Sequence, residues 1–344
     1  MNEFLKNPTR PLEIENIKDV AQLLEKMSGI SFQGRNLSTA LGVWKEMLKK
    51  NVVIFLGLSG AMIPGGLRQI LVYLIKNRLI DCLVSTGANL FHDLHESLGK
   101  YHYLGDHLTS DLKLRKAGID RIYDTFALEE EFRETDEYIK EFTRSFFDLE
   151  KSYSTREFFY SLGKVLSRMK KKEGMVSSAY ASGIPIFCPA IGDSSYGIAL
   201  VELGRETGKR FQFDVIQDAE EISNLVLWAK STGVIYIGGG TPKNFIQQAE
   251  VIASLQRESN KCGHEYAIQI VVDSPHWGGL SGCTFAEAQS WGKIHPKAKT
   301  VTVHSDATIA LPFLVGALSQ GSKGLIRKRK KPEFKFGKEL SLKR

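Results

Sequence analysis

The sequence predicts an α/β protein with a doubly wound, mostly parallel sheet and helices on both of its faces. Short continuous apolar runs, such as Val52–Leu56, have the composition of strands buried on both faces of a parallel sheet. Stretches with apolar residues at helical spacing, such as Leu67–Lys76, lie between these runs and recur along the chain. This alternation of strands and helices is typical of a Rossmann-like fold.

An N-terminal helical extension, residues 1–50, is predicted to precede the main domain, residues 51–322. In the extension, helical spacing predicts helices at Ile17–Met27 and Leu41–Leu48. After the first strand, further strands are predicted at Ile80–Val84, Ile184–Cys188, Val234–Ile237, Ile268–Val272 and Val301–Val303. Further helices are predicted at Gly197–Gly204, Ala219–Ser231, Pro242–Ser254 and Ile309–Ser319. Residues 129–172 are charged and helical in pattern, which indicates an insertion between the halves of the sheet.

Length and composition are those of an ordinary globular protein. The chain has 344 residues, 42% hydrophobic and 25% charged, which is enough for a proper core. Cys82, Cys188, Cys262 and Cys283 are scattered without a CxxC pair, so we expect neither a disulfide framework nor a metal site. Cys82 and Cys188 lie in apolar runs and are expected to be buried. Because the chain begins without a signal-peptide pattern and no apolar run is long enough for a membrane span, we expect a cytoplasmic protein.

The positive charge is concentrated at the end of the chain. The formal net charge is +7, and residues 323–344 contain ten Lys or Arg and two Glu, which leaves −1 for residues 1–322. A highly charged segment with few apolar residues is typical of a disordered tail. We therefore expect a solvated basic tail whose removal leaves the fold almost unchanged, and no contact with nucleic acid or a membrane.

Small residues form turns directly after three predicted strands: Ser59-Gly60-Ala61, Thr86-Gly87-Ala88 and Gly238-Gly239-Gly240. Such turns let a backbone approach a cofactor closely and offer amide donors to a pyrophosphate. None is a GxGxxG fingerprint, so the pattern alone leaves structural turns and cofactor turns open. Asp193 and Asp306 each follow a strand and open a helix, where a carboxylate can cap the helix or bind a ribose hydroxyl.

A short run near the end of the domain, Ser290-Trp291-Gly292-Lys293-Ile294, has residues suited to covalent chemistry. Burial beside tryptophan disfavours the charged form of a lysine, and a neutral amine can attack a carbonyl or an imine. The longer segment Phe285–Ile294 resembles the active-site segment of the deoxyhypusine synthase family. Five other stretches agree with that family in the same order: Gly34–Leu37, Leu83–Ala88, Pro185–Ala190, Ile237–Gly240 and His304–Ala307.

The resemblance implies an NAD-dependent transferase of polyamine metabolism. Members of that family oxidise spermidine with NAD and pass its aminobutyl group through an enzyme lysine to a lysine of a translation factor. By resemblance, Lys293 is the catalytic lysine, NAD is the cofactor and the protein is a homotetramer. Substrate-binding positions fall on Asn244, Glu287, Trp291 and His92. Cofactor-binding positions fall on Gly60, Ala61, Met62, Ile63, Pro64, Thr86, Gly87, Ala88, Asp193, Gly239, Asp306 and Ala307.

The polyamine pocket departs from the family pattern. Asn244 stands where the family has a histidine credited with proton transfer, and an asparagine cannot take a proton. The acidic positions that bracket spermidine are occupied by Phe91, His92, Ile198 and Leu280. Fewer carboxylates should weaken the binding of a long polyamine.

Three interpretations of the function therefore stay open. The main one is aminobutyl transfer from a polyamine through Lys293 to a protein lysine. The second is transfer to a small diamine, as in homospermidine synthases. The third is a catalytically idle homologue that binds NAD, against which the retention of Lys293, Glu287 and Trp291 argues.

Overall fold

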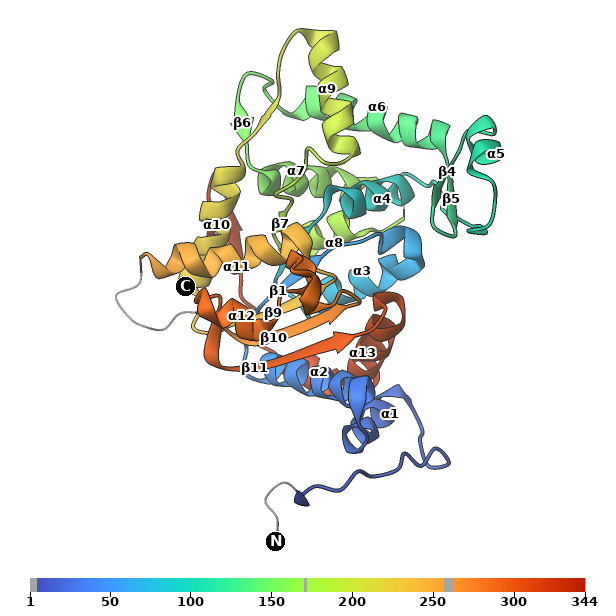
Figure 1. Ribbon diagram of the computed structural model, residues 1–344. Helices are drawn as coiled ribbons and strands as arrows, with labels where there is room; N and C mark the ends of the chain where they lie inside the picture. The colour runs from blue at the N-terminus through green and yellow to red at the C-terminus, as the bar shows by residue number, and fades with distance from the viewer. Residues whose placement is uncertain (1–4, 170–171, 257–262, 344) are drawn as a thin grey trace.

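The computed structural model describes residues 5–169, 172–256 and 263–343. Its centre is a six-stranded sheet in the order β11-β10-β9-β1-β2-β7, in which every neighbouring pair is parallel (Figure 1). The strands are β1 Val53–Leu58, β2 Cys82–Ser85, β7 Ile186–Phe187, β9 Thr232–Ile237, β10 His264–Val271 and β11 Ile294–His304. The chain builds outward from β1 in one direction and then returns to build from β1 in the other. The predicted doubly wound sheet is confirmed, with its switch point between β1 and β9.

Helices cover both faces of the sheet because alternate side chains of each strand point to opposite sides. On one face, Leu56 of β1 shares a buried core with Trp44. On the other face, Phe55 packs in a second core with Ile222 and Ile246. The helices of the first face include α2 Phe32–Lys49, α3 Arg68–Lys76 and α13 Ala307–Gly321. Those of the second include α10 Val215–Trp228, α11 Gly240–Ser254 and α12 Phe285–Ser290 (Figure 1).

The predicted elements are all present, and several are longer than predicted. The extension contains α1 Val20–Lys26 and α2, which begins nine residues before the predicted Leu41. The strand predicted at Val301–Val303 begins at Ile294, so Lys293 directly precedes β11. The structure also contains α4 Gly87–Ser97, whose side chains are nearly all buried. Polar side chains such as Asn89, His92 and Asp93 are buried along with the apolar ones, so burial in α4 does not follow the apolar pattern of the sequence.

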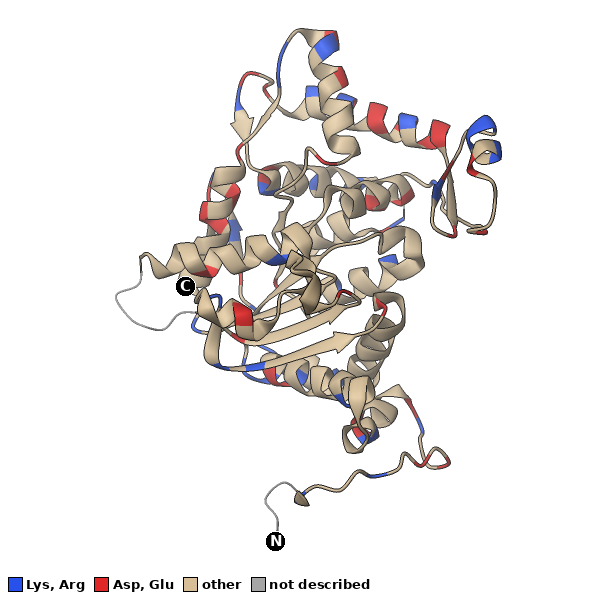
Figure 2. Ribbon diagram, in the orientation of Figure 1, with Lys and Arg blue, Asp and Glu red and all other residues tan. Residues whose placement is uncertain are grey.

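The charged insertion forms an outer layer beyond β7. It contains α6 Glu129–Phe146, along which acidic and basic residues alternate, and α7 Thr155–Arg168 (Figure 2). These pack with α8 Met175–Ser182 and α9 Ser195–Thr207. A small antiparallel sheet of β3 Tyr103–Leu104, β5 Thr125–Leu128 and β4 Ile119–Ile122 lies beside α5 Asp111–Lys116. A further parallel pair joins β6 Ser152–Tyr153 to β8 Gln212–Phe213.

The prediction of a disordered tail at residues 323–344 is wrong for the described residues, 323–343. They form α14 Lys323–Lys328 and a hairpin of β12 Phe334–Phe336 and β13 Leu340–Leu342. Two apolar side chains, Phe334 and Leu340, are buried in the core of the second face. Arg329 is fully buried and forms an ion pair with Asp81. The few apolar residues suffice because the hairpin presents them on one side and a carboxylate neutralises the buried arginine.

Two of the cysteine predictions are confirmed by burial. Cys82 and Cys188 are 0% exposed, and burial raises the pKa of both thiols. Cys262 lies outside the described residues. Among the described helices, none is long and apolar enough to cross a membrane.

Candidate active site

The three small-residue turns lie together at the carboxyl ends of adjacent strands. The turn at Gly60 follows β1, the turn at Gly87 follows β2, and the turn at Gly239 follows β9. This is the edge of the sheet where the switch point leaves a crevice for a ligand. Gly60 has φ +74° and Gly240 has φ +60°, values that favour glycine.

Asn89, a residue that the sequence analysis did not identify, joins two of these turns. Its side chain is fully buried and donates to the Gly60 carbonyl at 2.8 Å and to Thr86 Oγ1 at 3.1 Å. Its Oδ1 accepts from the amide of Met62 at 3.0 Å and from that of Ile63 at 3.4 Å. These bonds hold the Gly60–Pro64 segment against the start of α4.

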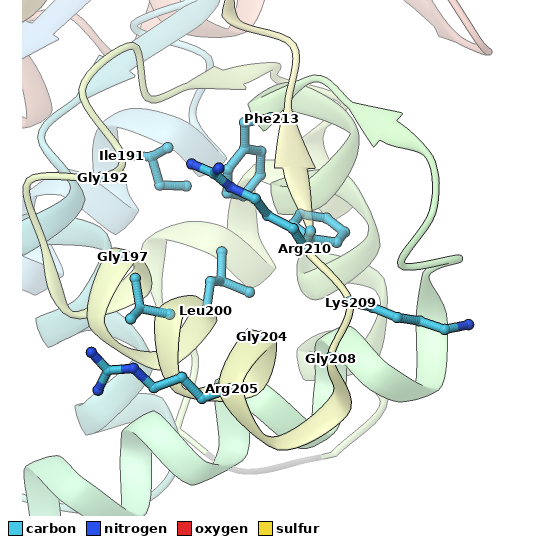
Figure 3. Close-up of a pocket in the computed structure, with 12 residues that line it drawn as sticks. Ile191, Gly192, Gly197, Leu200, Gly204, Arg205, Gly208, Lys209, Arg210 and Phe213 are labelled. Atoms are coloured by element: carbon cyan, nitrogen blue, oxygen red, sulfur yellow. The ribbon is translucent and has the colours of Figure 1, made fainter.

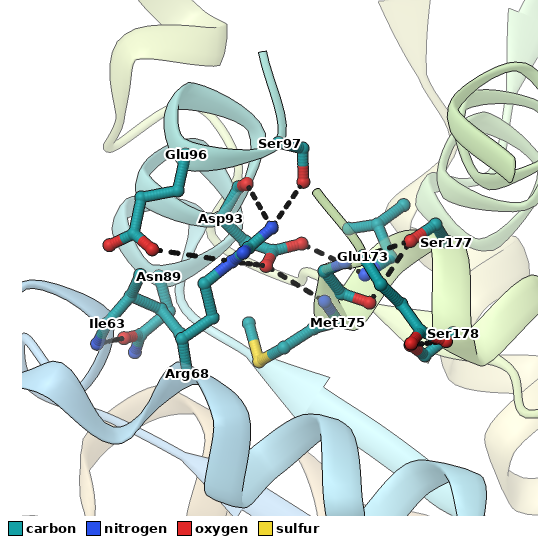
Figure 4. A network of polar contacts seen from close by, with 12 residues as sticks. Ile63, Arg68, Asn89, Asp93, Glu96, Ser97, Glu173, Met175, Ser177 and Ser178 are labelled. Carbon is teal, nitrogen blue, oxygen red and sulfur yellow. Dashed lines mark hydrogen bonds and ion pairs between the residues drawn. The ribbon is translucent and has the colours of Figure 1, made fainter. Parts of the chain in front are cut away.

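A polar network one turn further along α4 from Asn89 fixes α3, α4 and α8 to one another (Figure 4). Arg68 of α3 donates from Nε to Asp93 Oδ1 at 2.8 Å and from Nη2 to Ser97 Oγ at 2.7 Å. Asp93 also accepts from the amides of Met175 and Val176 at the start of α8. Since Arg68 and Asp93 are both buried, this pairing gives the turns at Gly60 and Gly87 a rigid base.

The residues at the turns fit a dinucleotide. A Cβ atom on Gly87 would lie 2.3 Å from Ser194 Oγ, and one on Gly239 would lie 2.5 Å from Ser281 Cα. Helices α4 and α11 begin at these turns, and neither has a side-chain cap at its first turn. Uncapped helix N-termini with closely packed backbones provide amide donors for a pyrophosphate.

The two aspartates differ in their local roles. Asp306 caps α13 and accepts from the amide of Thr308 at 2.6 Å, which confirms the capping interpretation at this position. Ala307 is the first residue of the same helix. Asp193 does not cap α9, because Ser194 is the N-cap residue. The Asp193 side chain is exposed, which leaves its carboxylate available to a ligand.

Lys293 lies beside the first turns of α11. Its Nζ donates to Asn244 Oδ1 at 3.1 Å and lies 5.2 Å from the centre of the Trp291 ring. Asn244 is five residues along α11 from the Gly239 turn, a rise of about 7.5 Å. The structure thus brings Lys293, Asn244 and Trp291 together near the Gly239 turn. Trp291 is 67% exposed, so in a single chain it does not close the site to water.

A second lysine, Lys243, is buried next to this group. Its Nζ donates to Gln269 Oε1 at 3.1 Å and to the Cys283 carbonyl at 2.6 Å. Burial lowers the pKa of Lys243, and the positive charge of Lys293 lowers it further, while Cys283 and Glu287 oppose the shift. Glu287 is therefore close enough to Lys243 to stabilise a positive charge on its amine. Its side chain is exposed at the surface of α12.

His92 lies in a different cluster from Lys293 in the described contacts. Its Nδ1 is 2.9 Å from His102 Nε2, and His102 Nδ1 is 2.9 Å from Glu96 Oε1. His95 packs against the same His102 ring and against Phe132. His92 is 8% exposed, so its predicted contact with substrate is not available from this buried position without movement.

This histidine cluster predicts a loss of stability in mild acid. Burial and neighbouring histidines lower the pKa of His92 to about 3 and that of His95 to about 4, from 6.5. The unfolded chain therefore binds more protons below pH 6.5, and stability is lost as the pH falls from 6.5 toward those values. At pH 5 the two groups together should lower the free energy of unfolding by about 4 kcal/mol.

Urea unfolding at pH 7.5 and pH 5 measures this effect. The double variant His92→Asn, His95→Asn should lose most of the pH dependence. The exposed residue His276 provides the control, since His276→Asn should retain the pH dependence of the wild type. An unchanged pH dependence in the double variant would assign the acid sensitivity to other groups.

A cavity of about 480 Å³ lies apart from these residues, between α9 and the segment that follows it (Figure 3). None of the predicted site residues lines it. Its lining combines apolar side chains with three cations: Ile191, Leu200, Val201, Phe211 and Phe213, with Arg205, Lys209 and Arg210. Cations on the lining do not suit an amine substrate, so this cavity is not the candidate active site.

The fold and the site define a doubly wound α/β protein with a lysine-centred site next to turns suited to a dinucleotide. The family model for deoxyhypusine synthase matches residues 22–318. The chain belongs to the deoxyhypusine synthase family. Membership implies an enzyme that transfers an aminobutyl group, with a polyamine as its substrate.

Relatives of known name are similar in sequence to this protein over nearly the whole chain. The probable deoxyhypusine synthase 2 of Methanosarcina acetivorans is 52% identical over 328 residues, 95% of this chain and 94% of the relative. The probable deoxyhypusine synthase 1 of the same organism is 36% identical over 315 residues, 91% of this chain and 95% of the relative. The crystal structure of a protein assigned as a deoxyhypusine synthase from Entamoeba histolytica has the same fold. It matches with a TM-score of 0.63 at 18% identity, over 90% of this chain and 96% of that one.

Proposed function

We propose that this protein uses NAD to oxidise an amine donor and transfers an aminobutyl group through an imine on Lys293. The observation that carries the proposal is the contact between Lys293 Nζ and Asn244 Oδ1, one to two helical turns from the Gly239 turn. Membership of the family supports the transfer reaction.

If bound, NAD would supply the oxidant for the donor carbon and the hydride that reduces the product imine at the end of the cycle. The residues that would hold it are those of the three turns, together with Asp193, Asp306 and Ala307. The uncapped starts of α4 and α11 offer amides, and the two exposed aspartates suit ribose hydroxyls.

Lys293 stores the transferred group. Its Nζ must lose a proton before it adds to the oxidised donor carbon; the bond from that carbon to the leaving amine then breaks, so that an imine to Lys293 remains. The acceptor amine then adds to the same carbon, and the bond to Lys293 breaks. Asn244 Oδ1 accepts a hydrogen bond from Nζ and so fixes the direction of the amine, but it cannot remove a proton.

We propose that the enzyme acts as a homo-oligomer, a tetramer by resemblance. Large apolar side chains of the segments that follow β10 and α12 are exposed in the single chain, with Val272 at 72%, Trp277 at 77% and Trp291 at 67%. Exposed apolar patches of this kind mark interaction surfaces. A second copy that covers Trp291 would exclude water from the imine.

The substitutions at the expected polyamine-binding positions favour a donor or acceptor with fewer charges than the standard polyamine. Ile198 and Leu280, which replace acidic residues of the family pattern, are 57% and 41% exposed and offer no charge. Each missing charge-assisted hydrogen bond weakens binding by about 1.5–3 kcal/mol. Transfer to a small diamine is therefore the second candidate function.

The test is incubation of the purified protein with NAD and a panel of di- and polyamines, with products identified by mass. We expect efficient turnover with a short diamine and poor modification of the hypusine-bearing translation factor. The triple variant Asn244→His, Ile198→Asp, Leu280→Asp should raise turnover of spermidine at least about tenfold. The control Val201→Asp places a carboxylate on the same exposed helix, α9, and should leave turnover unchanged. Efficient modification of the translation factor by the wild type would contradict the specificity proposal, and no product with any amine would favour the idle homologue.

A further inference from the structure

Three polar side chains are buried together where α11 crosses the first residues of β9 and β10. Glu250, His264 and Thr232 are 1%, 0% and 4% exposed. Thr232 Oγ1 lies 3.1 Å from Glu250 Oε1 and 2.9 Å from His264 Nδ1. His264 Nδ1 is also 3.4 Å from the Glu250 carboxylate. A buried carboxylate is stable only with partners of this kind, and the proposed chemistry makes no use of this group.

This cluster is bonded to the residues that hold the main chain of Lys293. The amide of Gly263 donates to Glu250 Oε2 at 3.1 Å, and the next amide, of His264, donates to the Lys293 carbonyl at 3.1 Å. Gly263 has φ +99°, and a Cβ atom there would lie 2.4 Å from the amide nitrogen of His295. Only glycine allows the two segments to approach this closely.

Helix α11 therefore holds Lys293 at two points. Asn244 accepts a hydrogen bond from the Lys293 amine. Glu250 accepts one from the amide of Gly263, and the next amide along the chain, of His264, donates to the Lys293 carbonyl. The two residues are six positions apart, or about 9 Å along the helix axis. A shift of about 1 Å in a reacting group can lower a rate a hundredfold.

We propose that Glu250 and His264 are positioning residues, which set the main chain of Lys293 so that its amine meets the donor carbon. The inference rests on the proposed role of Lys293. A cluster that only stabilised the fold would lower the melting temperature and leave the turnover of the folded enzyme unchanged. A positioning cluster changes kcat while KM and cofactor affinity stay close to those of the wild type.

The test compares Glu250→Gln with the control Glu221→Gln in the full-length protein. Glu221 is another buried carboxylate, 3% exposed and paired with Arg156 away from Lys293, so its loss reports the effect of reduced stability alone. At a temperature well below both melting points, Glu250→Gln should lower kcat at least about tenfold, with KM within about threefold. Glu221→Gln should leave kcat within twofold of the wild type, on the same reasoning.

Amide hydrogen exchange supplies a readout that does not depend on activity. The peptide of residues 263–271 begins beside the cluster, and its amide hydrogens should exchange faster in Glu250→Gln than in the wild type. In Glu221→Gln the exchange rate of the same peptide should equal that of the wild type. If Glu250→Gln does not fold, Thr232→Val, which keeps the shape of the side chain, takes its place. Unchanged exchange or unchanged kcat in the cluster variant would overturn the inference. If the wild type is inactive but the exchange difference is observed, the proposed catalytic role of Lys293 is contradicted. The exchange difference would still show that Glu250 holds this segment in place.

Discussion

Replacement of Lys293 by alanine is expected to abolish aminobutyl transfer, with a loss of at least about a thousandfold in kcat/KM. Without the amine no covalent carrier remains, and an oxidised donor would be lost to water. Lys293→Arg should be equally inactive, because a guanidinium keeps the charge but does not form an imine. Product yield and NADH formation, measured with the best amine of the panel, check the result.

Lys297 provides the matched control for this prediction. It is exposed in the same segment, four residues after Lys293. Lys297→Ala should retain activity within about twofold, as expected for an exposed lysine outside the site. Transfer by Lys293→Ala at a rate near that of the wild type would show that the group never passes through this residue.

Deletion of residues 323–344 is expected to lower the free energy of unfolding by at least about 5 kcal/mol. The deletion exposes the surface covered by Ile326, Phe334 and Leu340, which are buried. It also removes Arg329, whose Nη1 is 3.1 Å from Asp81 Oδ1 and whose Nη2 donates to the Val52 carbonyl at 2.7 Å. Urea or thermal unfolding of the truncated chain measures the loss.

Point variants separate the parts of this effect. Arg329→Ala should lower stability by about 3–5 kcal/mol, because Asp81 loses a buried partner. Lys335→Ala, at an exposed position of the same tail, should change it by less than about 0.5 kcal/mol. If the truncated protein is as stable as the full chain, residues 323–344 do not contribute to the fold and form the solvated tail that their composition predicts.

The sheet could be predicted because its strands are continuous apolar runs. Val52–Leu56 predicted β1 within one or two residues. A strand that is buried on both faces consists of consecutive apolar residues, which are easy to recognise in the sequence. The tail could not be predicted from composition, because its burial depends on partners far away in sequence. Arg329 is 248 residues from Asp81, and no local pattern indicates that pairing.

Part of the candidate site could be predicted from the sequence, because several of its residues lie in short motifs. Lys293, Asn244 and Trp291 come together as the resemblance implies. Lys243 was not singled out, because nothing in its neighbourhood of the sequence distinguishes a buried lysine from an exposed one. His92 was placed with the substrate by its position in a motif, but its partner His102 comes from the segment after α4. Tertiary packing, which the motif does not contain, decides where that side chain points.

Borohydride trapping on the wild-type protein tests the central claim most directly. Incubation with NAD and a competent amine, followed by borohydride, should reduce the imine to a stable secondary amine. Mass spectrometry should then find the added aminobutyl group on Lys293, in the peptide that contains Trp291 to Ile294, and only when both NAD and the amine are present. An adduct on another lysine, or none with an amine that the enzyme turns over, would contradict the proposed role of Lys293.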